Sequence, residues 1–113
     1  MNPTQLYVIK VNQPRRSEHD DQRFFEITMI DDNLNEYQTF VVETYRNFKY
    51  WRDIIAVAQE GKVVRIEGVF VIKPHTNPPQ IDADSTPRFC DAHDVSEFAD
   101  VVEHKILDIK KPH

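Results

Sequence analysis

Most of the chain alternates between short apolar runs and polar turns, which is the pattern of a β-rich domain. The apolar runs are rich in β-branched and aromatic residues, and clusters of Asn, Asp, Gln and Pro separate them. Five strands are predicted, over residues 6–11, 24–30, 36–44, 63–73 and 80–84. Gly68 lies inside the fourth of these and indicates a bulge or sharp bend there.

The hydrophobic period changes to that of a helix after Tyr45. A helix over residues 47–60 is predicted, and its apolar face consists of Phe48, Trp51, Ile55 and Ala58. We expect Trp51 to pack in the core. A second helix is predicted over residues 95–109, with an apolar face of Phe98, Val102, Ile106 and Ile109.

This order of elements predicts a mainly β fold, a five-stranded OB-fold β-barrel with a helix between strands 3 and 4 and an additional C-terminal helix. An α+β sandwich with an open sheet is the alternative. A closed barrel is favoured because it leaves no edge strand with unpaired backbone groups. We divide the 113 residues into an OB-fold barrel (1–90) and a C-terminal amphipathic helix and tail (91–113). The wide apolar stripe of this helix predicts packing either on its own barrel or on another subunit.

The charge is unevenly distributed along the chain. The net charge is −5, and residues 1–90 hold 11 basic against 13 acidic residues while residues 91–113 hold 3 against 6. The barrel is therefore nearly neutral, which leaves room for a local basic groove. The net negative charge of the whole chain opposes nucleic-acid binding, because such binding depends on neutralising phosphates.

Several classes of protein have no support in the sequence. There is no run of roughly 20 apolar residues to span a bilayer, and no basic start followed by an apolar stretch suggests export. A single cysteine, Cys90, fits a reducing compartment. We expect a cytoplasmic protein that does not contact membranes.

Catalytic and metal-binding motifs are also missing. The only glycines, Gly61 and Gly68, form no phosphate-binding loop. Cys90 and His93 make one ligand pair, whereas a closed zinc site needs a second. We expect neither an enzyme nor a cofactor.

One passage resembles a known family. Residues 54–70, which read IIAVAQEGKVVRIEGVF, resemble the helix-to-fourth-strand passage of bacterial-type single-stranded DNA-binding proteins. The resemblance implies an OB-fold, single-strand binding and a homo-oligomer. Members of that family usually end in an acidic tail with an apolar tip, whereas residues 108–113 of this chain, DIKKPH, are basic as a whole and have no such tip. The resemblance therefore implies a divergent phage, plasmid or accessory replication or recombination type.

Single-strand binding on such a barrel needs outward aromatic rings that stack on bases and cations that follow the backbone. The stacking candidates are Phe24 and Tyr37, which are predicted in the opposite phase to the core residues. The cationic candidates are Lys10, Arg15, Arg16, Arg23, Arg65 and Lys73. The alternative is that the two rings help to close the core and that the cations are solvated.

Two functions follow from this reading. The first is binding of single-stranded DNA without sequence specificity, with the preference for DNA or RNA left open. The second is an OB-fold protein-interaction module, an adaptor or an inhibitor of a host enzyme, that binds no nucleic acid; the net charge favours it.

Overall fold

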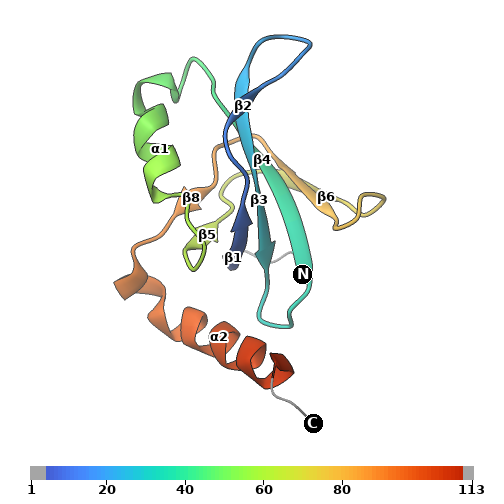
Figure 1. Ribbon diagram of the computed structural model, residues 1–113, viewed down its shortest axis with the longest axis vertical. Helices are drawn as coiled ribbons and strands as arrows, with labels where there is room; N and C mark the ends of the chain where they lie inside the picture. Colours follow the sequence, from blue (N-terminus) through green and yellow to red (C-terminus); the bar gives the residue numbers. More distant parts are fainter. Residues whose placement is uncertain (1–4, 111–113) are drawn as a thin grey trace.

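The computed structural model describes residues 5–110, so the predicted tail at 111–113 lies outside the described residues. These residues form one eight-stranded mixed sheet, strongly curled, with two helices outside it (Figure 1). The strands are β1 (Gln5–Val11), β2 (Arg15–Arg16), β3 (Arg23–Ile30), β4 (Glu36–Val42), β5 (Val63–Arg65), β6 (Phe70–Lys73), β7 (Gln80–Ala83) and β8 (Arg88–Phe89). The helices are α1 (Trp51–Val57) and α2 (Ser96–Lys110), preceded by the 3-10 turns η1 (Phe48–Tyr50) and η2 (Ala92–Val95).

The mainly β character is confirmed, and strands occur in all five predicted regions, but the strand count of five is too low. The predicted fourth strand is divided into β5 and β6 by a bend at residues 66–69. Gly68 has φ +81°, a left-handed conformation that strains residues with a Cβ, so the bend favours glycine. The other two additions, β2 and β8, have two residues each, which is too short to leave a hydrophobic period.

The sheet is curled so that this bend joins β6, at one end of the strand order, to β5, next to the other end. The strand order is β6-β7-β4-β3-β1-β5-β8, and β2 pairs with β3 outside this path. β5 pairs with β1 and β6 pairs with β7, although only residues 66–69 separate them. All these pairs are antiparallel except β4 with β7, which is parallel. The result is a β-barrel-like shell.

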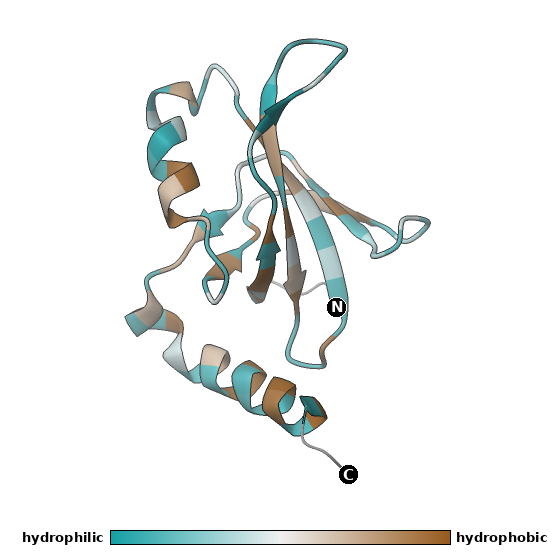
Figure 2. Cartoon of the chain, viewed as in Figure 1, coloured by the Kyte–Doolittle hydropathy of each residue, from teal (hydrophilic) through white to brown (hydrophobic). Residues whose placement is uncertain are grey.

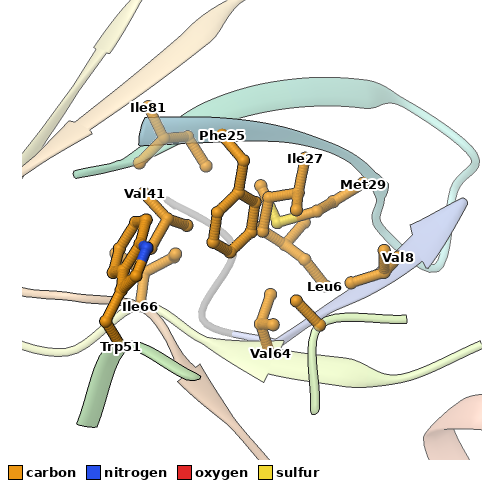
Figure 3. Close-up of a cluster of buried hydrophobic side chains, with 11 residues drawn as sticks. Leu6, Val8, Phe25, Ile27, Met29, Val41, Trp51, Val64, Ile66 and Ile81 are labelled. Atoms are coloured by element: carbon orange, nitrogen blue, oxygen red, sulfur yellow. The ribbon is translucent and has the colours of Figure 1, made fainter. Parts of the chain in front are cut away.

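The main core fills this shell (Figure 3). Phe25, Ile27 and Met29 point inward from β3 toward Leu6 of β1 and Val64 of β5. Each of these side chains is almost fully buried, as expected for alternate residues of a strand with one face inside.

Trp51 at the start of α1 closes the core, as predicted. Its ring centroid lies 5.6 Å from that of Phe25, and the side chain is 2% exposed. The predicted position of Phe48 on the same buried face is wrong, because Phe48 is exposed. Asn47 is buried instead, and its amide donates to Val42 O at 2.9 Å and Thr86 Oγ1 at 3.1 Å.

α2 packs on its own barrel through its first half. Val102 is fully buried, and Phe98 and Ala99 pack against a small second core of Val63, Cys90 and Val95. The second half presents mixed apolar and polar residues (Figure 2). Within residues 5–110, no helix combines the length and the apolarity needed to cross a membrane.

Candidate nucleic-acid interface

The outer face of β3 and β4 carries two aromatic rings. Residues directly opposite each other in an antiparallel pair share a face, and the register pairs Phe24 with Val42 and Glu26 with Phe40. Both pairs lie opposite in phase to the buried pair Phe25 and Val41. The rings of Phe24 and Phe40 meet edge to face, with centroids 5.9 Å apart at 67°. Part of the outer surface is therefore aromatic.

Two hollows join along this face. The first, about 380 Å³, is lined by Phe24 and Phe40, by residues of the loop before β3, and by β7. The second, about 520 Å³, extends toward Tyr45 and Arg46. Phe40, Val42, Ala83 and Ser85 line both hollows, so we treat them as one continuous depression, the outer groove.

Arginines lie over two of the groove's aromatic rings. Arg15 Cζ is 4.8 Å from the ring centroid of Phe24, and Arg46 Cζ is 5.5 Å from that of Tyr45. Such cation–π contacts place positive charge beside rings that can stack on bases. Arg46 lines the second hollow and Arg15 covers part of the Phe24 ring, while the carboxylates of Asp20, Asp82 and Asp84 also line the groove.

Most of the predicted cations are paired with carboxylates. Arg15 lies 3.8 Å from Glu26, Arg16 3.4 Å from Asp21, and Lys73 3.2 Å from Asp82. Arg23 forms an ion pair with Glu43, with Nε 3.0 Å from Oε1. The pairs made by Arg16 and Lys73 are exposed on both sides, so each stabilises the fold by about 1 kcal/mol or less and can be exchanged for a phosphate contact, whereas the carboxylates of Glu26 and Glu43 are only 22% and 19% exposed.

The structure brings only some of the predicted site residues together. Phe24 lies on the outer face as expected, with Arg15 over it. Lys10 is exposed, pairs in register with Thr28, and makes no ion pair within residues 5–110. Arg65 is on β5, separated from β3 by β1, and faces Gln5. Arg65 therefore lies away from the outer groove.

The outward position predicted for Tyr37 is wrong. Tyr37 pairs with Met29 on the inner face and packs against the core. Burial raises its pKa, and the charge and hydrogen bonding of Asp31 raise it further. The misleading residue is Thr39, which is polar yet buried on this inner row, where its Oγ1 donates to Ile81 O at 2.8 Å.

Three groove residues were missed by the sequence reasoning: Phe40, Tyr45 and Arg46. Phe40 could have been found by placing Val41 opposite Phe25, which reverses the assumed phase of β4. Tyr45 and Arg46 lie between the predicted strand over residues 36–44 and the predicted helix over residues 47–60, and no periodic signal marks them.

No candidate metal centre emerges from the part of the chain that the structure describes, where no three His, Cys, Asp or Glu side chains are grouped suitably. Cys90 is a free, buried thiol. Comparison with models of protein families, with curated proteins and with solved structures found no significant match to this chain.

Proposed function

We propose that this protein is an OB-fold that binds single-stranded nucleic acid, without base specificity, along the outer groove. The strand pairing supports the fold assignment. If the two-residue strands are set aside and β5 and β6 are counted as halves of one bent strand, five strands remain. Their pairing is that of a Greek-key barrel, with β4 and β7 parallel.

The position of the groove supports the ligand. OB-folds bind oligonucleotides on the face of their second and third strands and on the neighbouring loops. β3 and β4 hold those two places in the chain order. The observation that carries the proposal is the sequence of rings along one groove, Phe24, Phe40 and Tyr45, with Arg15 and Arg46 beside them.

Stacking rather than charge supplies most of the affinity in this proposal. The net charge of −5 repels a polyanion at long range. Each base stacked on an aromatic ring contributes about 1–3 kcal/mol, and every base has a face to stack. Binding without base preference follows from that chemistry.

Fluorescence anisotropy of labelled oligo-dT, starting at low salt and followed by a salt titration, tests the proposal. Phe40→Ala is expected to weaken binding roughly 5- to 150-fold, the equivalent of one lost stack. Leu107→Ala, which removes an exposed apolar side chain from α2, is the control and leaves binding unchanged. No binding of the parent protein at the lowest salt contradicts the proposal.

The ion pairs at the groove favour one alternative, a protein-interaction module that binds no nucleic acid. Cations already matched by Glu26 and Asp82 suit a partner with mixed charges as well as a phosphate backbone. Under this alternative, oligonucleotides leave the anisotropy unchanged, while Phe40→Ala abolishes a complex recovered from host lysate.

A further inference from the structure

We infer that residues 44–52, the aromatic–basic segment between β4 and α1, form a second contact for the same single strand and lengthen its path beyond the outer groove. This inference rests on the proposed function. Tyr45 and Arg46 already belong to the end of the groove, and the inference adds Phe48, Lys49, Tyr50 and Arg52, which lie outside the barrel strands.

The composition of the segment differs from that of the chain as a whole. It contains Arg46, Lys49 and Arg52 and no Asp or Glu, in a protein whose net charge is −5. Within residues 5–110, none of these three cations forms an ion pair. The cations of the barrel face are mostly neutralised by carboxylates, whereas these remain available to phosphates.

The segment also presents the protein's most exposed aromatic rings. Tyr45 is 79% exposed, Phe48 53% and Tyr50 61%. Among the described residues, the only other large aromatic side chain in the exposed class is Phe40, inside the groove, at 36%. Rings left in water forgo the free energy of burial, so a row of them beside cations indicates a surface that a ligand covers.

Buried anchors hold this surface in place. Asn47 is buried, and besides donating to Val42 and Thr86 it accepts from Thr44 N at 2.7 Å. Trp51 enters the core at the other end of the turn. The exposed rings between them are thus mounted on a fixed backbone, which lowers the entropy lost on binding.

The segment continues directly from the outer groove. The second hollow of the groove ends at Tyr45, Arg46 and Asn47, and η1 begins at the next residue. In Figure 1 the chain leaves β4 and passes to α1 at the end of the sheet where β2 lies. A strand stacked on Phe24, Phe40 and Tyr45 therefore reaches Phe48 and Lys49 without crossing another element.

Oligonucleotide length separates the two contacts. We would compare oligo-dT of about 5 and about 15 nucleotides, near the two ends of the site sizes of single OB-folds. Lys49→Gln/Arg52→Gln is expected to weaken binding of the long oligonucleotide about tenfold at low salt and to leave the short one unchanged. The slope of log affinity against log salt for the long oligonucleotide becomes shallower by about 1.4, the loss of two single-strand phosphate contacts.

Lys105→Gln/Lys110→Gln on α2 is the matched control, because it changes the net charge equally and leaves both the affinity and the slope unaltered. Phe48→Ala/Tyr50→Ala tests stacking by the same comparison, and both side chains are exposed enough for the fold to survive.

The outcomes are distinct. If the parent binds oligo-dT but neither double variant of the segment alters the long-oligonucleotide affinity, the inference is overturned and the proposed function stands. If the parent binds no oligonucleotide, the proposed function itself fails. A native mass that falls from dimer to monomer in Phe48→Ala/Tyr50→Ala, with DNA binding intact, assigns the surface to a second copy instead.

Discussion

Phe24 and Phe25 are neighbours in the chain and have opposite surroundings. Phe25 faces Val41 across the strand pair and packs on Trp51 in the core. Phe24 lies in the outer groove, with Arg15 over its ring and Phe40 at its edge. The same side chain packs in the core on one face of the sheet and lines a surface groove on the other. In a curled sheet, strand phase decides which role an aromatic residue takes.

The largest effects are expected when Phe25 and Phe24 are each replaced by alanine and both stability and oligo-dT binding are measured. Phe25→Ala leaves a cavity in a close-packed core and is expected to lower the free energy of unfolding by about 3–5 kcal/mol. Phe24→Ala removes a half-buried ring and is expected to cost about 1 kcal/mol or less, while it weakens oligo-dT binding. Urea denaturation and anisotropy on both variants make the comparison. Equal losses of stability would show that the two faces are not distinct.

A smaller effect is expected at the one threonine that is buried on the inner face of β4. Thr39→Val keeps the shape of the side chain but removes the hydroxyl that donates to Ile81 O, so it is expected to cost about 1–3 kcal/mol. Thr28→Val on the outer face of β3 is the matched control and changes stability by about 0.5 kcal/mol or less. Urea denaturation measures both variants. An unchanged free energy of unfolding in Thr39→Val would show that the hydrogen bond from the hydroxyl to Ile81 O does not stabilise the contact between β4 and β7.

The strands were predictable because their apolar residues alternate or cluster between turn signals. The split of the fourth strand was also within reach, since Gly68 marked a bend. The strands that pair with its two halves could not be predicted, because pairing depends on which distant strands the chain meets after it bends.

The candidate site was less predictable than the fold. A polar Thr39 in the inner row made the inner and outer faces of β4 look alike, so Tyr37 was assigned outward in place of Phe40. Phe48 fits a helical face by spacing, yet the hydrogen bonds of Asn47 place that amide inward instead. The spacing of apolar residues does not reveal a polar side chain that is buried because nearby groups satisfy its hydrogen bonds.

The outer face also differs from the inner one in its charges, and these can be adjusted. Glu26→Gln/Asp82→Asn frees Arg15 and Lys73 and is expected to raise oligo-dT affinity by about fivefold or less, in line with about 1 kcal/mol or less per surface pair. Glu97→Gln/Asp100→Asn on α2 makes the same change in net charge away from the groove. Anisotropy at matched salt compares the two, and equal gains would attribute the effect to net charge alone.

The smallest effect expected concerns the inner tyrosine at alkaline pH. Burial, followed by the nearby Asp31, raises the pKa of Tyr37 above the ordinary 10.0, so the folded protein favours the neutral phenol. The phenol of Tyr37 therefore contributes to the free energy of unfolding in a pH-dependent way. The contribution is fully present below pH 10.0 and is lost as the pH rises through the raised pKa of the folded state. Tyr37→Phe cannot ionise, so its free energy of unfolding is expected to fall less than that of the parent between about pH 8 and about pH 11, on either side of the ordinary value. Urea denaturation at the two pH values measures the difference. An identical fall in both proteins would place Tyr37 in a more solvated setting than the inner face provides.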